Sequence, residues 1–119
     1  MKRFAQTIRL RPEHREKYLE LHSAVWPGVE AALHRARIRN YSIYLHGDVL
    51  FAYFEYHGED FDADMAELEA DPVTQEWWTH TDPCQEPWPD RGDSRQWTEL
   101  PEVWHLGEPV GPTADPTAG

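Results

Sequence analysis

The sequence predicts an α+β fold of the ferredoxin-like (split βαβ) plan, with a four-stranded antiparallel sheet and helices on one face. Three observations support this prediction: a strand pattern that opens the chain, a proline-interrupted helical pattern after it, and a β-hairpin signal in the middle. The length of 119 residues suits one domain, which we place at residues 1–106.

The first strand and the first helical stretch follow from a change in periodicity. Apolar or long side chains alternate with smaller or charged ones from Phe4 to Leu10, which is typical of a strand. Apolar positions from Tyr18 to Leu33 then recur at helical spacing, after a proline at position 12 that suits a first helical turn. Because proline lacks a backbone donor, Pro27 should kink this helix or split it into two abutting helices.

The next two strands form the predicted hairpin. Residues 38–45 and 49–56 are rich in β-branched and aromatic side chains, and His46-Gly47-Asp48 separates them. Alternation places Tyr41 on one face of this hairpin and Tyr44 on the other. One face can pack against the helices, so a partner subunit or a ligand should cover the aromatic side chains of the other.

Two short helices and a last strand are expected in the second half. Apolar spacing predicts a helix over Asp60–Glu69, and Asp71-Pro72 reads as a cap and first turn of another that runs through Trp78. Prolines at 83, 87 and 89 predict an irregular segment over residues 82–93. The final strand should lie within residues 97–106, with Val103, Trp104 and Leu106 as its apolar content, and residues 107–119 should be a Pro/Gly-rich disordered tail.

Charge and composition exclude several function classes. A net charge of −11 argues against nucleic acid and anionic membrane surfaces as partners. Apolar runs are far shorter than the roughly 18 residues of a membrane span, and the basic start is not followed by the apolar segment of a signal peptide. The single cysteine, Cys84, makes no internal disulfide, so we expect a cytoplasmic protein.

Tyr18, His22 and Trp26 form one row on the predicted helix. In the functional interpretation, His22 lines a pocket and transfers a proton near neutral pH, since its ordinary pKa is about 6.5. Tyr18 would then orient a ligand hydroxyl. In the structural interpretation, His22 is a core histidine with satisfied hydrogen bonds, and the two aromatic side chains only pack.

The adjacent pair Trp77-Trp78 is harder to explain by packing alone. Neighbouring helix positions point about 100° apart, so the two side chains cannot both enter one core. Flat aromatic faces beside polar groups suit a sugar, while the alternative is that one ring packs and the other lies in a subunit interface. His80, Asp82 and Cys84 are close together, but no second ligand pair at zinc-like spacing accompanies them, and we expect no metal site.

These motifs in their joint order resemble the L-rhamnose mutarotase family. The resemblance covers about Phe4 to Leu106 and rests on Tyr18 and His22 with the following Val25-Trp26-Pro27, on residues 40–45 and 50–52, and on the tryptophan pair. It implies a ferredoxin-like fold of the dimeric α+β barrel type, a homodimer, and interconversion of the α and β anomers of a 6-deoxy sugar without cofactor or metal. It also implies roles for five residues: His22 as the proton donor, and Tyr18, Tyr41, Trp77 and Trp78 as sugar contacts.

Two departures from the family pattern leave the sugar open. Ser23 stands where many relatives carry Asn, and the polar segment Thr79–Gln85 replaces an apolar helical continuation. L-fucose or another related sugar is therefore an alternative substrate. Two other classes also remain: a cofactor-free monooxygenase or haem-handling protein on a similar fold, with His22 as ligand or base, and a non-catalytic sugar-binding module.

Overall fold

The computed structural model describes residues 1–109, and its elements follow the predicted α+β order. The strands are β1 (Lys2–Leu10), β2 (Ile38–His46), β3 (Val49–Tyr56), β4 (Gln85–Glu86) and β5 (Thr98–Leu100). They form one antiparallel sheet in the order β2-β3-β1-β4, and β5 also pairs with β1. The fourth position of the sheet is thus shared by two short strands, where the sequence predicted a single strand.

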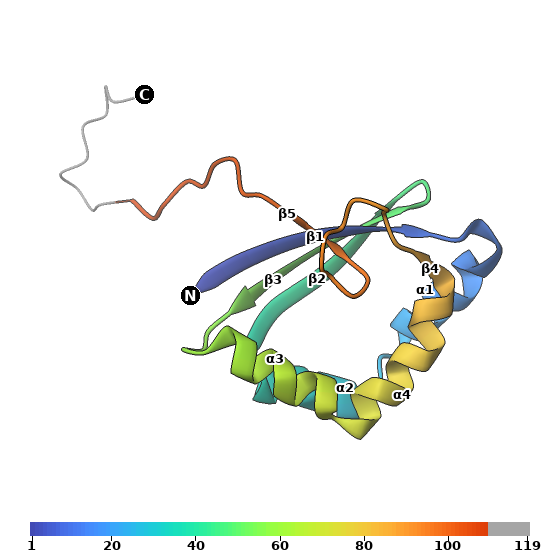
Figure 1. Cartoon of the computed structure of the whole chain (residues 1–119), viewed down its shortest axis with the longest axis horizontal. Helices are drawn as coiled ribbons and strands as arrows, with labels where there is room; N and C mark the ends of the chain where they lie inside the picture. Colours follow the sequence, from blue (N-terminus) through green and yellow to red (C-terminus); the bar gives the residue numbers. More distant parts are fainter. Residues whose placement is uncertain (110–119) are drawn as a thin grey trace.

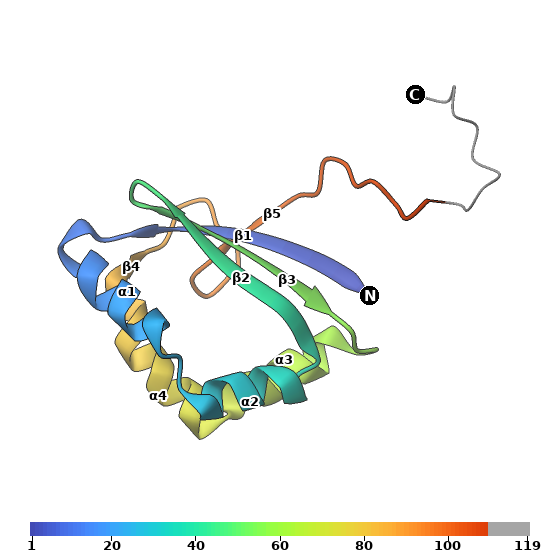
Figure 2. The ribbon, with the colours of Figure 1, turned by 180° about the vertical axis from the view of Figure 1, so that it is seen from behind.

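The helices all lie on one face of this sheet, as predicted (Figure 1). The helix α4 (Pro72–Thr81) contacts both α2 (Pro27–Arg35) and α3 (Phe61–Ala70), and α1 (Arg15–Ser23) reaches α4 through His22 and Trp77 (Figure 2). Single 3-10 turns at Pro12–His14 (η1) and Asp82–Cys84 (η2) precede α1 and follow α4. The helical stretch is split at Pro27, which occupies the first turn of α2, where its missing N–H costs no hydrogen bond.

The buried core consists of two clusters near the two ends of the sheet. One is built from Ile8, Leu10, Tyr18, Leu50 and Cys84, and the other from Ala36, Ile38, Phe54 and Tyr56. Between them, in the middle of β1, Gln6 is paired with the small residue Ala52 of β3. The clusters hold the strands and helices together at both ends and leave room over the centre of the sheet's inner face, the face toward the helices.

The C-terminal part of the fold differs from the prediction in two places. Residues 82–93 are not wholly irregular, because they contain η2 and the two residues of β4 that pair with the end of β1. The last strand is limited to Thr98–Leu100, and Pro101, which has no N–H for a ladder, follows directly. Val103, Trp104 and Leu106 lie outside it and are exposed. Most of the predicted tail, residues 110–119, lies outside the described residues.

The outer face of the sheet carries aromatic side chains, as the hairpin pattern predicted. Tyr44 is 64% exposed, and Phe51, its partner across β2 and β3, is also exposed. Within residues 1–109, none of the helices has the length and apolar character that crossing a membrane requires.

Candidate active site

A cavity of about 1090 Å³ lies between the inner face of the sheet and the helices. All five residues singled out in the sequence line it: Tyr18, His22, Tyr41, Trp77 and Trp78. They come from three elements that are far apart in the sequence, namely α1, β2 and α4. The structure thus brings the predicted site residues together, and their roles toward a sugar stay predictions.

Aromatic rings on the helices form one side of the cavity. Tyr18 and His22, one turn apart on α1, have ring centroids 4.3 Å apart. The edge of His22 meets Trp77 of α4 at 5.4 Å, and Trp26 meets the same tryptophan at 5.1 Å. Of these four residues, Tyr18, His22 and Trp77 line the cavity, and we call them the helical wall; Trp26 contacts Trp77 without lining the cavity. Its rings contact one another in a continuous series, so each ring limits the rotation of the next.

The surroundings of His22 fix its tautomer. Its Nδ1 lies 2.9 Å from the backbone carbonyl oxygen of Tyr18. A carbonyl oxygen only accepts, so Nδ1 carries the hydrogen and donates it. Burial lowers the pKa of His22 below its usual value, and the bond to the carbonyl only partly offsets this. Near neutral pH the imidazole is therefore neutral, with the lone pair of Nε2 available to accept a proton.

The two tyrosines of the site remain protonated. Burial raises the pKa of Tyr18, and a hydrogen bond from Gln85 acts in the opposite direction. Burial also raises the pKa of Tyr41 to about 12, although the residue as a whole is 38% exposed. Both hydroxyls are consequently hydrogen-bond donors throughout the neutral pH range.

A β-bulge decides the position of Tyr41. The pairing of β2 with β3 shifts between Arg39 and Ser42, so one more residue lies on β2 than on β3 there. Strict alternation from the buried Ile38 would place Tyr41 on the outer face. The extra residue reverses the alternation, and Tyr41 stacks on the inner-face residue Phe54 with centroids 5.5 Å apart. We call the inner-face residues Gln6, Tyr41, Ile43 and Phe54 the sheet wall.

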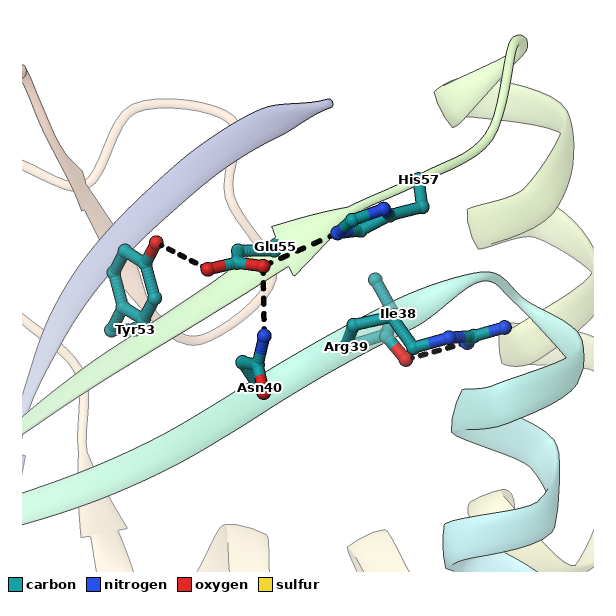
Figure 3. A network of polar contacts seen from close by, with 6 residues as sticks. All are labelled: Ile38, Arg39, Asn40, Tyr53, Glu55 and His57. Carbon is teal, nitrogen blue, oxygen red and sulfur yellow. Dashed lines mark hydrogen bonds and ion pairs between the residues drawn. The ribbon is translucent and has the colours of Figure 1, made fainter. Parts of the chain in front are cut away.

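Polar contacts hold the bulge in place (Figure 3). Asn40 has a φ of 52°, a left-handed conformation that asparagine tolerates better than most residues. Its amide donates to Oε1 of Glu55 at 2.9 Å, and Tyr53 donates to Oε2 at 2.9 Å, with His57 also at 3.2 Å from Oε1. These contacts lower the pKa of Glu55, that from Asn40 most strongly. The ionised carboxylate therefore stabilises the backbone conformation that turns Tyr41 inward.

The adjacent tryptophans have different surroundings. Trp77 is buried within the helical wall, whereas Trp78 is half-buried beneath the guanidinium of Arg95, which lies 4.2 Å from its ring centroid. Arg95 is held in turn by Asp82, with Nη1 2.6 Å from a carboxylate oxygen. Since Arg95 also lines the cavity, the segment after β4 contributes to the site.

Sequence reasoning missed several polar residues of the cavity. These are Gln6, Gln85, Arg95 and Gln96. Gln6 could have been noticed, because a glutamine at an inward strand position is unusual among apolar neighbours. The other three depend on β4 and on the loop after it, for which the sequence has no periodic pattern.

The side chains of His80, Asp82 and Cys84 have different partners. The Cys84 thiol donates to the carbonyl oxygen of His80, while Asp82 pairs with Arg95. Across residues 1–109, no group of three or more histidine, cysteine, aspartate or glutamate side chains is arranged to hold a metal ion.

Comparison with known proteins gives a consistent result. A sequence model of the L-rhamnose mutarotase family matches residues 3–106. The L-rhamnose mutarotase of Phocaeicola vulgatus is 35% identical over 108 residues, covering 89% of this chain and 99% of that protein. The L-rhamnose mutarotase of Bacteroides thetaiotaomicron is 33% identical with the same coverage.

Solved structures share the fold. An L-rhamnose mutarotase from Formosa agariphila superposes with a TM-score of 0.70 at 23% identity, covering 90% of this chain and all of that one. Tetracenomycin F2 cyclase from Streptomyces glaucescens, a type-II polyketide cyclase, superposes with a TM-score of 0.63 at 15% identity, covering 92% of this chain and all of that one. These likenesses confirm the predicted α+β fold, while the match over nearly the whole sequence is more specific. The chain belongs to the L-rhamnose mutarotase family.

Proposed function

We propose that this protein catalyses the interconversion of the α and β anomers of L-rhamnose. The observation that carries the proposal is His22, which lines the cavity and whose Nε2 has no hydrogen-bond partner among residues 1–109. Family membership supports the same reaction, since the relatives over nearly the whole chain are L-rhamnose mutarotases. The Formosa agariphila protein shares the fold.

In the proposed mechanism, His22 moves one proton between two oxygens of the sugar. Nε2 takes the proton of the anomeric hydroxyl, the C1–O5 bond breaks, and C1 becomes an aldehyde. The imidazolium then gives the proton to O5, which it can reach because O1 and O5 are bonded to the same carbon. After rotation about C1–C2, the same steps in reverse close the ring as the other anomer. His22 is thus the base first and the proton donor second.

The remaining site residues would bind and orient the sugar. Trp77 and Trp78 present aromatic faces on which the C–H bonds of a pyranose can pack, and Tyr18 and Tyr41 donate to its oxygens. The reaction transfers a proton and breaks and re-forms one C–O bond within the sugar, with no net change of oxidation state and no group passed to another molecule. Acid–base catalysis by His22 can therefore carry it without a redox cofactor or a group carrier.

Saturation-transfer NMR tests the proposal directly. The anomeric protons of L-rhamnose, L-fucose, L-mannose and D-glucose are each measured with and without catalytic amounts of the protein. We expect accelerated exchange for L-rhamnose, and the L-fucose sample tests the alternative left open by the polar segment after Trp78. Sugar binding without faster exchange of any of these sugars would contradict the enzyme proposal and favour a binding module.

We also propose that the protein is a homodimer in the cytoplasm. Tyr44 and Phe51 expose aromatic surface on the outer sheet face, and Trp104 is 75% exposed beyond β5. A second copy would remove this apolar surface from water. The buried, unpaired Cys84 suits a reducing compartment. Sedimentation velocity should give a dimer that Tyr44→Glu dissociates, and a wild-type monomer at micromolar concentration would refute the assembly.

A further inference from the structure

A short chain of side-chain amides ends on the Tyr18 hydroxyl. Gln85, the first residue of β4, places its Nε2 3.4 Å from the Tyr18 oxygen. The Oε1 of the same side chain accepts from Nε2 of Gln96 at 3.3 Å. Gln85 is only 5% exposed, and both glutamines line the cavity. Both the nitrogen and the oxygen of the Gln85 amide are therefore hydrogen-bonded, which fixes the orientation of the amide.

We propose that Gln85 is a positioning residue that makes Tyr18 a hydrogen-bond donor toward the sugar. The proposal rests on the proposed function, because it assumes that a sugar occupies the cavity. In the bound complex, an oxygen of the sugar accepts the hydrogen bond from the Tyr18 hydroxyl. Gln96 keeps the amide of Gln85 in the orientation that this requires.

The direction of the hydrogen bond between Gln85 and Tyr18 follows from which of their atoms can donate and which can accept. An amide nitrogen only donates, so its contact with Tyr18 uses a lone pair of the phenol oxygen and leaves the phenol hydrogen free. The buried apolar residues that cluster with Tyr18 are Ile8, Leu10, Leu50 and Cys84, which offer no strong acceptor side chain. Among residues 1–109, no acceptor for the hydroxyl hydrogen is found, and the cavity is the direction in which one can arrive.

Burial of Gln85 would otherwise be unfavourable. An amide taken out of water costs free energy unless it is hydrogen-bonded, and an apolar side chain in a strand beside Leu10 would avoid that cost. The pairing of β4 with the end of β1 brings this amide to the Tyr18 hydroxyl, while the backbone carbonyl of Tyr18 contacts Nδ1 of His22. Tyr18 thus serves both groups: its carbonyl sets the His22 tautomer and its hydroxyl is set by Gln85.

Two substitutions at Gln85 distinguish an effect of its hydrogen bond to Tyr18 from an effect of its packing. Gln85→Met keeps approximate size without a donor. Gln85→Glu can donate to Tyr18 when the carboxyl is protonated but can only accept when it is ionised. Because burial raises the pKa of a carboxyl above its usual value of about 4.3, this change should fall within an accessible pH range. The exposed Gln75, which bonds the Glu69 carbonyl, provides control variants with the same two substitutions.

The readout is the Kd for L-rhamnose, followed by tryptophan fluorescence, with circular dichroism on each sample to establish folding. Values are divided by the wild-type Kd at the same pH, which removes the pH dependence that His22 contributes to all variants. We expect Gln85→Met to raise Kd about tenfold, the equivalent of one hydrogen bond. Gln85→Glu should bind like the wild type at low pH and lose affinity as the carboxyl ionises, and Gln96→Met should fall between the wild type and Gln85→Met.

A pH-independent Kd ratio for folded Gln85→Glu, or wild-type affinity in folded Gln85→Met, would overturn the proposal. Should Gln85→Met fail to fold, the pH course of Gln85→Glu decides on its own. The outcomes also separate this proposal from the enzymatic one. A wild-type protein that binds L-rhamnose without anomer exchange refutes the mutarotase function, while the Kd ratios still decide the role of Gln85. A wild-type protein that does not bind L-rhamnose refutes both.

Discussion

The helical wall and the sheet wall face the same cavity but are positioned in different ways. In the helical wall, Tyr18 and His22 share a face because they are one helical turn apart, and Trp77 packs directly against His22. In the sheet wall, Tyr41 points inward only because a bulge at Asn40 reverses the strand alternation. One half of the site thus depends on regular structure, and the other on a local irregularity held by polar contacts on the opposite face of the sheet.

The largest effect is expected in the helical wall, at His22. The His22→Asn variant keeps approximate size and a hydrogen bond but cannot exchange a proton near neutral pH. Its anomer-exchange rate, measured by saturation transfer, should fall by about 10²–10⁴-fold, and its melting temperature should stay near the wild-type value. The exposed His105 provides the control His105→Asn, which should not change the rate. Reduced stability with an unchanged rate per folded molecule would mean that His22 only packs.

The tryptophan pair should divide into a mainly structural and a mainly binding residue. Trp77 is 6% exposed and contacts His22 and Trp26, so Trp77→Ala should cost about 3–5 kcal/mol in the free energy of unfolding. Trp78→Ala should cost less, because this ring is half-buried under Arg95. Denaturant titration gives both values. In Trp77→Phe and Trp78→Phe, which retain most of the packing, sugar affinity should fall, and parental affinity in both would exclude a sugar contact.

A smaller effect is expected from the bulge in the sheet wall. Asn40→Ala removes the bond to Glu55 and disfavours the left-handed φ, so it should destabilise the fold by about 1 kcal/mol or more. It should also raise KM several-fold by displacing Tyr41, with less effect on kcat. Asn40→Gly separates the two causes, since glycine accepts this φ without making the bond. If KM is unchanged in both variants, the position of Tyr41 does not depend on the bulge.

The smallest effect is expected outside both walls, at the start of α3. The Asp60 carboxylate caps this helix by accepting from the backbone N–H of Ala63 at 3.1 Å. Asp60→Ala should therefore reduce stability by about 1 kcal/mol, measured by thermal unfolding, and leave the exchange rate per folded molecule unchanged. A large loss of rate would show that catalysis depends on residues that do not line the cavity.

The difference between the walls also explains what the sequence could predict. Helical spacing correctly placed Tyr18 and His22 on one face of α1. Trp26, predicted in the same row, lies instead in the break between α1 and α2, because the helical stretch is split before Pro27. Alternation identified both faces of the hairpin. The reversal of alternation between Ile38 and Tyr41 was not predictable, because it depends on the left-handed conformation of Asn40, which no sequence pattern signals clearly. Gln85 and Arg95 were missed because contacts distant in sequence bring them to the cavity. Gln85 is placed by the short pairing of β4 with β1, and Arg95 by its ion pair with Asp82.

The dependence of kcat/KM on pH tests the central claim, that neutral His22 accepts the first proton. The exchange rate of L-rhamnose is measured from about pH 4 to 8 in the wild type and in His22→Asn, with the uncatalysed rate subtracted at each pH. Because burial lowers the pKa of His22 from 6.5, wild-type kcat/KM should be constant near neutrality and fall as the pH drops through a midpoint below 6.5. His22→Asn should show no such decrease. A wild-type rate that rises below pH 6.5, or a decrease that persists in His22→Asn, would contradict the account.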